Sequence, residues 1–143
     1  MPLHGYYLED LSEGMSAAFG KTVTDADVLM YAGVSGDTNP VHLNEEFALE
    51  TPFHGRIAHG MLTAGLISTV FGTKLPGPGC IYVSQTLHFL APVRVGETVR
   101  AEVTVKSIDH DRRRCIFDTV CKVGAKKVLE GEAVLMVTRR PKA

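Results

Sequence analysis

One stretch of the sequence decides the fold, residues 60–71, which read GMLTAGLISTVF. Apolar and small residues occupy this stretch nearly all round, and it carries no charge. Such a pattern is typical of a helix that is buried on most of its surface. The run Pro76-Gly77-Pro78-Gly79 follows and predicts a tight turn that ends the helical segment. We therefore expect residues 60–71 to form the central helix of the molecule.

After this helix, the hydrophobic period of the sequence changes to two. Alternating residues predict strands over residues 81–89, 98–108, 115–123 and 128–138, and a further short strand is expected over residues 16–23. A helical half followed by antiparallel strands predicts an α+β fold, in which the sheet wraps around the long apolar helix. Because the open edge of such a sheet is commonly covered by pairing, we expect a homodimer.

Two more helices are predicted before the central one. Thr24 begins a sequence that resembles a capping box, so we expect a helix over residues 25–35, closed by Gly36 as its C-cap. Asn44 is a candidate N-cap of a second, short helix. That helix should end before Pro52, because the residue before a proline avoids the helical region.

Length and composition fit one globular domain. The chain has 143 residues, of which 45% are apolar and 22% are charged, and these values are ordinary for a soluble folded protein. A chain of this length can enclose one core but has little room for two. We therefore expect a single domain over residues 1–143, with its core at about residues 14–139.

Charge and cysteine usage limit the partners and the compartment. The net charge of −1 supplies no long-range field that would recruit nucleic acid or an anionic membrane, so we expect neither as a partner. The N-terminus lacks the basic and apolar regions of a signal peptide, and the apolar run of residues 60–72 is too short to cross a bilayer. Three cysteines without CxxC spacing suggest neither a disulfide framework nor a zinc site and fit a cytoplasmic location.

A carboxylate and an imidazole lie five residues apart in the segment GDTNPVH, residues 36–42. Five residues turn an α-helix by about 500°, and Pro40 disfavours helix at Asn39. We therefore expect a turn that can aim Asp37 and His42 into one cavity, where such a pair serves general acid–base chemistry. The spacing alone fits a second interpretation equally well, in which Asp37 caps a turn and His42 packs beneath it.

The start of the predicted central helix is a second candidate site. Free N–H groups at a helix N-terminus can stabilise negative charge on a carbonyl oxygen, which makes the Gly60 N–H a candidate oxyanion donor. Alternatively, the glycine serves only close packing. His59 is a candidate site residue or a helix-entry histidine, and Ser68 either contributes to the site or bonds the carbonyl four residues before it. Ligand spacing such as HExxH is missing from the sequence, so we expect no metal.

Together these motifs resemble the MaoC-like hot-dog family, and specifically its R-specific enoyl-CoA hydratases, also called hydratase 2. The resemblance rests on GDTNPVHL at residues 36–43, AHGML at residues 58–62 and PGPGCIYVSQ at residues 76–85. It extends from about residue 14 to the C-terminus, and D-x-x-N-P-x-H is its most specific part. A hot-dog fold, in which an antiparallel sheet encloses a helix, agrees with the expectation from the sequence pattern.

The resemblance implies reversible, stereospecific addition of water to a trans-2-enoyl-CoA, which gives an (R)-3-hydroxyacyl-CoA. It implies that Asp37 and His42 are the catalytic pair, although the sequence does not assign which of them activates the water. The amide of Gly60 would hold the thioester oxygen. The substrate-binding set in this interpretation is Gly60, Ser68, Asn39 and His59.

The resemblance also implies the partners of the protein. Coenzyme A enters as part of an acyl-CoA substrate, so no separate cofactor is expected. The acyl tunnel of the relatives runs at a dimer interface, which implies a homodimer or a dimer of dimers. The CoA phosphates need cations near the mouth of the site, and the candidates are Arg56, Lys74 and Arg94, although each of them also fits a solvated surface charge.

Three alternatives remain open from the sequence. An acyl-CoA thioesterase of the same fold would direct water at the thioester carbonyl in place of C3, and the fold does not decide between the two reactions. A related dehydratase could act on acyl-carrier-protein thioesters. A non-catalytic acyl-CoA binding module would need neither Asp37 nor His42, so the presence of both favours an enzyme.

Overall fold

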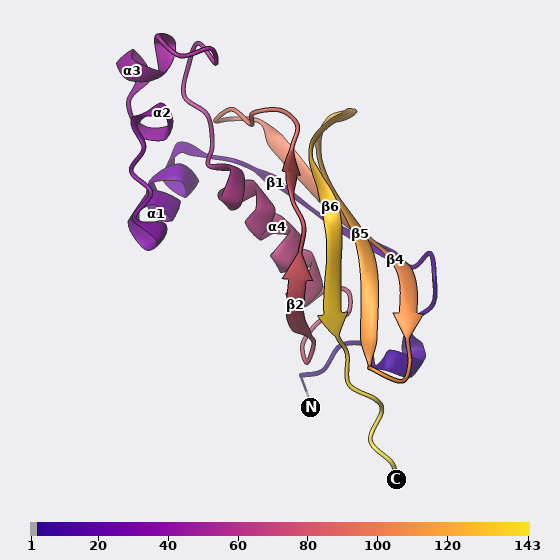
Figure 1. Ribbon diagram of the computed structural model, residues 1–143. Helices are drawn as coiled ribbons and strands as arrows, with labels where there is room; N and C mark the ends of the chain where they lie inside the picture. Colours follow the sequence, from indigo (N-terminus) through magenta and orange to yellow (C-terminus); the bar gives the residue numbers. More distant parts are fainter. Residues whose placement is uncertain (1–2) are drawn as a thin grey trace.

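The computed structural model describes residues 3–143 as a sheet with one long helix against it and three shorter helices beside them (Figure 1). In chain order, its elements are a 3₁₀ turn (Leu8–Asp10), β1 (Ser16–Thr22), α1 (Asp25–Ser35), α2 (Pro40–Leu43), α3 (Glu45–Leu49), α4 (Gly60–Thr73), β2 (Ile81–Gln85), β3 (His88–Phe89), β4 (Thr98–Asp109), β5 (Arg114–Val123) and β6 (Lys126–Met136). None of the helices formed by residues 3–143 combines the length and the apolar character that a membrane crossing needs.

The sheet is antiparallel throughout and has the order β1-β4-β5-β6-β2, with β3 also paired to β6. Strands β4, β5 and β6 begin and end within two residues of the predicted ranges. Alternate residues of β4 are fully buried, as expected where one face of a sheet covers a core. The predicted α+β hot-dog architecture is therefore confirmed.

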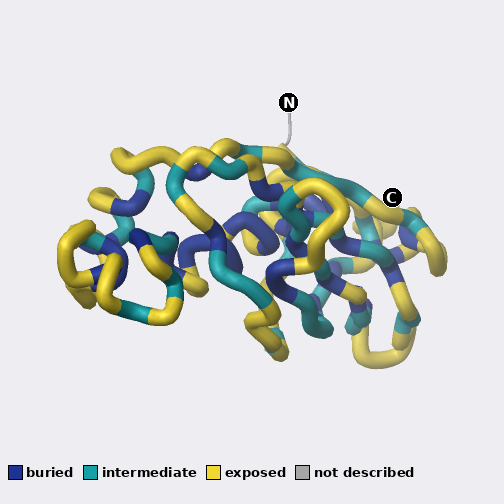
Figure 2. The backbone as a smooth tube through the Cα atoms, turned by 90° about the horizontal axis from the view of Figure 1, so that it is seen from above, coloured by how far each residue is buried: buried dark blue, intermediate teal, exposed yellow. Residues whose placement is uncertain are grey.

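The core lies between α4 and the sheet, and exposed residues follow the margins of the molecule (Figure 2). Ile67, Val70 and Phe71 of α4 are at most 1% exposed. The Phe71 ring meets the Phe117 ring of β5 edge-on, with 4.9 Å between their centroids, and such aromatic pairs add to the stabilisation that burial provides. These contacts fix α4, and with it the residues at its N-terminal end, relative to the sheet.

One stripe of α4 departs from the prediction that the helix is buried on most of its surface. Met61, Gly65, Ser68 and Gly72 are exposed in the protomer. Their spacing of three or four residues places them on one side of the helix. The apolar character all round the helix therefore reflects burial against the sheet on one side and an uncovered face on the other.

The prediction of a single strand over residues 81–89 is wrong. Two strands form, β2 and β3, and both pair with β6. Between them, the carbonyl of Thr86 passes so close to Gly131 that a Cβ at that glycine would lie 1.8 Å from the Thr86 oxygen. This crossing, together with a register shift between Tyr82 and Ser84, interrupts the pairing that simple alternation predicts.

Local capping explains the helices before α4. Thr24 accepts a hydrogen bond from the Asp27 N–H, and Asp27 accepts one from the Thr24 N–H, which completes the predicted capping box of α1. Gly36 ends α1 with φ at 78°, as its role of C-cap requires. Asn44 accepts from the Phe47 N–H and begins α3, so the predicted start of that short helix is also confirmed.

The expected turn over residues 36–42 is only partly correct. Asp37 lies in a loop, but His42 lies on the short helix α2. Pro40 occupies the first turn of this helix, where its missing N–H costs no hydrogen bond and its fixed φ suits the helix. The proline thus separates the two residues, with one in the loop before it and the other in the helix that it begins.

Candidate active site

A cavity of about 510 Å³ opens at the N-terminal end of α4. Its polar wall includes Asp37, His42, His59 and Gly60. Most of the remaining wall is apolar and comes from the segment before α4, the first turn of α4, the chain around β3 and the start of β6: Phe53, Ile57, Ala58, Met61, Phe89, Leu90, Ala91, Pro92, Val93, Val128 and Leu129. An apolar cavity with a few polar groups is the arrangement expected of a small-molecule site.

Asp37 is held in the loop after α1 by short-range hydrogen bonds. Its N–H donates to the Ser35 hydroxyl at 3.1 Å, and its Oδ1 accepts from the Asn39 N–H at 3.2 Å. The turn-capping interpretation therefore holds for one carboxylate oxygen. The same side chain lines the cavity, so capping and exposure to a ligand are combined in one residue.

His42 is buried and held from two sides. Asn39 accepts a hydrogen bond from the Val41 N–H at 3.1 Å and caps α2, the helix that carries His42. The Nδ1–H of His42 donates to the Ile57 carbonyl at 2.8 Å, because a carbonyl can only accept. Its Nε2 is therefore the ring nitrogen left for the cavity.

The surroundings of His42 keep its ring neutral. Burial lowers the pKa of His42 below the ordinary value of 6.5, and the neighbouring His59 ring lowers it further. The hydrogen bond to Ile57 and the charge of Asp37 raise the pKa, but they do not offset the burial. At neutral pH, the Nε2 of His42 therefore has a free lone pair and can act as a base.

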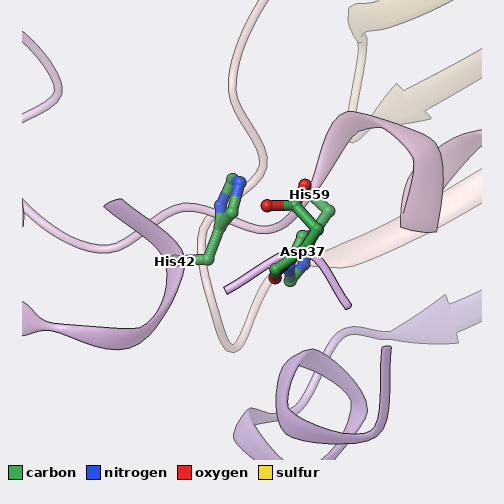
Figure 3. Close-up of side chains that lie close together, drawn as sticks. All are labelled: Asp37, His42 and His59. Carbon is green, nitrogen blue, oxygen red and sulfur yellow. Dashed lines mark hydrogen bonds between the residues drawn. The ribbon is translucent and has the colours of Figure 1, made fainter. Parts of the chain in front are cut away.

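His59 is 1% exposed and contacts both members of the pair (Figure 3). Its Nε2–H donates to the backbone carbonyl of Asp37 at 2.9 Å. Its ring lies 3.9 Å from the His42 ring, centroid to centroid, at an angle of 31°, and 4.6 Å from the Tyr31 ring. The structure thus joins three residues that the sequence separates by as many as 22 positions.

Gly60 is the first residue of α4, and its N-cap, His59, makes no side-chain capping bond. The first N–H groups of a helix have no partner inside the helix, so this end of α4 presents donors beside Asp37 and His42. The Phe89 ring packs against the same glycine, where a Cβ would lie 2.6 Å from Cε1 of Phe89. Gly60 therefore combines the two roles that the sequence left open: it packs closely against Phe89, and its N–H is a free donor at the start of the helix.

The model of the MaoC-like domain family matches residues 11–130. The chain belongs to this family. It is 53% identical over 135 residues to an "(R)-specific enoyl-CoA hydratase" of Rhodospirillum rubrum, with 94% of each chain covered. It is 49% identical over 137 residues to a "3-hydroxybutyryl-CoA dehydratase" of Methylorubrum extorquens, with 96% of this chain and 87% of the relative covered.

A solved structure of a MaoC-like relative has the same fold. R-hydratase PhaJ1 of Pseudomonas aeruginosa, in its unliganded form, superposes with a TM-score of 0.90 at 37% sequence identity. The match covers 96% of this chain and 89% of that one. The position of α4 against the sheet is therefore a property that this MaoC-like chain shares with an R-hydratase.

The side chains of Asp37, His42 and His59 in this MaoC-like site come close enough to raise the question of a metal. One ligand atom from each lies within 4.8 Å of the others, so His59, a candidate site residue in the sequence, stands beside the pair of Asp37 and His42. However, the two ring planes are tilted by 31° and the ring centroids lie 3.9 Å apart, so the two imidazoles contact each other through their faces. A carbonyl also occupies one nitrogen of each ring. This arrangement suits proton transfer better than metal coordination.

Ser68 of the MaoC-like chain lies outside this cavity. It lines a neighbouring hollow of about 380 Å³ between α4 and β2, together with Met61, Gly65, Tyr82 and Leu87, among others. Met61 lines both hollows. The structure therefore gathers Asp37, His42, His59 and Gly60 around one space and places Ser68 in the next one along α4.

The three candidate cations for CoA phosphates all contact other parts of the protein. Arg56 donates to the His42 carbonyl at 2.7 Å and pairs with Asp25 at 2.6 Å, so it supports α2. Arg94 donates to the Phe53 carbonyl. Lys74, at the other end of α4, donates to the Ala18 carbonyl at 2.7 Å. These contacts favour structural roles for the three side chains.

Sequence reasoning missed Ile57 and Phe89. Ile57 acts through its carbonyl, which orients His42, and a backbone acceptor has no residue signature. Phe89 fits the apolar alternation of a strand, and only the split between β2 and β3 brings it to Gly60. A sequence signal for that split exists in Gly131, but its partner Thr86 lies 45 residues earlier.

Proposed function

We propose that the protein is an (R)-specific enoyl-CoA hydratase, which adds water reversibly to a trans-2-enoyl-CoA and gives an (R)-3-hydroxyacyl-CoA. One observation carries the proposal. The Asp37 carboxylate, the free Nε2 of His42 and the N-terminal donors of α4 at Gly60 line one cavity of about 510 Å³. The names of two relatives support the proposal further, because one is an enoyl-CoA hydratase and the other is a dehydratase, which runs the reverse reaction.

In the proposed reaction, a water molecule is held between the Asp37 carboxylate and the Nε2 of His42. The pair removes one proton while the water oxygen bonds to C3 of the substrate. The electron pair of the double bond moves through C2 onto the thioester oxygen, and the Gly60 N–H stabilises the resulting enolate. The same pair then returns the proton to C2. Because the proton and the hydroxyl come from one side, the addition is syn.

Asp37 and His42 are treated as one coupled acid–base unit. The neutral state of the His42 ring, which follows from the lowered pKa, suits it to accept a proton first. Asn39 supports the unit by capping α2. We place His59 and Gly60 beside the thioester and Ser68 farther along the acyl chain, since Ser68 lines the second hollow.

We infer that the acyl chain leaves the first cavity past Met61 and follows the exposed stripe of α4. This stripe and the neighbouring strand β2 are uncovered in the protomer, where Met61 is 54%, Ile81 55% and Val83 48% exposed. A second copy seated here would cover both and enclose the chain, which motivates a homodimer, with a dimer of dimers as the larger assembly.

The proposed chemistry needs no further cofactor and no metal, because an acid–base pair and one oxyanion donor suffice for the addition of water. Coenzyme A arrives and leaves with the substrate. We propose further that the whole chain, residues 1–143, works as one domain in the cytoplasm, and that neither nucleic acid nor a membrane is a partner.

The experiment that tests the function follows purified protein with crotonyl-CoA and records the enoyl-thioester absorbance and the release of free thiol together. The proposal predicts a loss of absorbance without thiol and a product that only an R-specific dehydrogenase oxidises. Release of thiol would identify a thioesterase instead. A constant signal in both channels would contradict catalysis on this substrate and favour a binding module. Size measurement in the same buffer tests the dimer.

A further inference from the structure

We propose that His59 is a positioning residue, which holds Asp37 and His42 in the geometry for proton transfer through two separable contacts. One contact is its hydrogen bond to the Asp37 backbone, and the other is its ring against the ring of His42. The proposal deepens the hydratase function and rests on it, but one of its tests does not require activity.

The first contact ties the catalytic loop to the start of α4. The Nε2 of His59 lies 2.9 Å from the Asp37 carbonyl oxygen, and since that oxygen can only accept, Nε2 carries the proton. The other hydrogen bonds of Asp37 reach only Ser35 at the end of α1 and Asn39 at the start of α2. The bond from His59 therefore fixes the position of the loop relative to Gly60, the neighbour of His59 in the chain.

The second contact fixes the ring of His42. The Ile57 carbonyl holds its Nδ1 at 2.8 Å, and the His59 ring covers one face at a centroid distance of 3.9 Å. Tyr31 of α1 contacts His59 in turn at 4.6 Å. With an edge and a face of the ring both held, the direction of the His42 Nε2 is set before a substrate binds.

The environment of the other ring nitrogen of His59, Nδ1, favours a positioning role for this residue over a role in proton exchange. In the part of the chain that the structure describes, Nδ1 of His59 is buried and has no hydrogen-bond partner. A proton there would be a buried donor without an acceptor, which is unfavourable. The hydrogen bond to Asp37 therefore places the proton on Nε2, and Nδ1 has no partner among residues 3–143 with which it could exchange a proton. An apolar ring of similar shape would avoid the unpartnered atom, so packing alone does not require a histidine here.

The groups around His42 determine how its titration responds to changes at His59. Asp37 and His59 face its ring. Arg56, which is paired with Asp25, bonds the carbonyl of His42 on the backbone side. Burial and His59 both lower the pKa of His42. The His59 ring lies against the His42 ring, so its loss removes part of the burial and should raise the pKa of His42 toward its ordinary value. A phenyl ring keeps this burial, which is the main cause of the lowered pKa, and should leave the pKa below that value.

Two variants separate the two contacts. His59→Phe keeps a ring against His42 but loses the donor to Asp37. His59→Gln keeps an amide donor but loses the ring. We expect His59→Phe to keep its melting temperature and the acid limb of its pH profile while kcat for crotonyl-CoA falls about tenfold or more, with a much smaller change in KM. His59→Gln should have a higher kcat than His59→Phe, because it keeps a donor to Asp37. The acid limb of its pH profile should lie at higher pH than that of the wild-type protein.

Matched controls are His110→Phe and His110→Gln, because His110 lies in the exposed turn between β4 and β5. These should match the wild-type protein in every readout. The proposal is overturned if both His59 variants keep wild-type kcat and pH dependence. It is also overturned if His59→Phe loses activity only in proportion to a loss of folded protein, since that result would mean a purely structural role.

An NMR measurement decides the same question without substrate. Long-range ¹H–¹⁵N spectra of the imidazole rings should show the Nε2–H tautomer for His59 and the Nδ1–H tautomer for His42. His42 should titrate at higher pH in His59→Gln than in the wild-type protein. The Nδ1–H tautomer at His59, or an unchanged His42 titration, would refute the positioning role. If these spectra agree while crotonyl-CoA is not hydrated, only the proposed function fails.

Discussion

The ring of Phe89 lies directly against Gly60, so that a Cβ at Gly60 would stand 2.6 Å from Cε1 of Phe89. Phe89 comes from β3, which pairs with β6, and Gly60 begins α4. This contact sets the distance between the edge of the sheet and the proposed oxyanion donor. The ring also covers one side of the cavity that Asp37 and His42 line.

Gly60→Ala should therefore impair the reaction more than it impairs folding. The added methyl group must displace either the Phe89 ring, which is 54% exposed and can move, or the start of α4. Either shift misplaces the donor, so we expect kcat/KM for crotonyl-CoA to fall about tenfold or more with a small change in melting temperature. Gly33→Ala in α1 is the control, because nothing lies within 4 Å of its added Cβ.

A double mutant identifies the displaced group. If the methyl group acts through the ring, Gly60→Ala should cost less activity in a Phe89→Ala background than in the wild-type protein. Equal costs in both backgrounds would mean that the methyl group acts elsewhere, for example directly on the substrate.

Removal of either member of the proposed acid–base pair should nearly abolish hydration. Asp37→Asn and His42→Ala should each lower kcat by about 10²-fold or more, as the loss of general acid–base catalysis does. Circular dichroism should show that both variants are folded. Asp111→Asn, in the exposed turn between β4 and β5, provides the matched control. Near-native turnover in either variant would remove that residue from the mechanism.

Acid should inactivate the protein below the ordinary pKa of histidine. The pKa of His42 is lowered from 6.5, chiefly by burial. As the pH falls through this lowered value, Nε2 gains a proton and can no longer accept one from water, so kcat/KM should decline with a midpoint below 6.5. A rate profile from about pH 5 to about pH 8 checks this. A midpoint above 6.5 would contradict the burial of the neutral ring.

The same group links folding to pH. Between the ordinary and the lowered pKa, the unfolded chain binds a proton at His42 that the folded chain does not. The contribution of this group to the free energy of unfolding is therefore complete above pH 6.5 and decreases as the pH falls below it. Denaturant titrations of the wild-type protein and His42→Gln at a few pH values should isolate this contribution.

Features fixed by local hydrogen bonds could be predicted from the sequence. The capping box at Thr24 and the C-cap at Gly36 depend on residues within a few positions of one another, and α1 begins and ends where they indicate. A bend between Asp37 and His42 was predicted from Pro40, which is also a local signal, although the spacing alone fitted turn capping and packing equally well.

Features that depend on distant backbone groups could not be predicted. The carbonyl that orients His42 lies 15 residues away, and the one that accepts from His59 lies 22 residues away. The exposed stripe of α4 has a related cause. Residues such as Met61 and Gly65 look equally apolar in the sequence whether their own sheet or a second copy covers them.

The buried cysteines should be inert in the folded protein. Burial raises the pKa of Cys115 and of Cys121 to about 12, so almost no thiolate is present at neutral pH. Burial also raises the pKa of Cys80. Iodoacetamide at neutral pH should therefore leave the activity unchanged, and mass spectrometry should show modification of Cys115 and Cys121 only after unfolding. Rapid alkylation of Cys115 or Cys121 in active protein would contradict their burial.

Met61 should control the length of the acyl chain that the protein accepts. It lines both the cavity with Asp37 and His42 and the hollow that holds Ser68, so a chain longer than that of crotonyl-CoA has to pass its side chain. Met61→Phe should narrow this passage and lower kcat/KM for 2-octenoyl-CoA about tenfold more than for crotonyl-CoA. Met61→Ala should shift the preference toward the longer substrate.

The control for Met61 is Met30→Phe, since Met30 is 61% exposed on α1 and lines neither hollow. Ser68→Ala should reduce turnover less than the changes at Asp37 or His42, because Ser68 lies beyond Met61 and away from the reacting carbons. Molecular size is measured for each variant, because the exposed stripe is also the surface proposed to meet a second copy. An unchanged ratio of the two substrates in Met61→Phe, at unchanged size, would mean that the acyl chain does not follow α4.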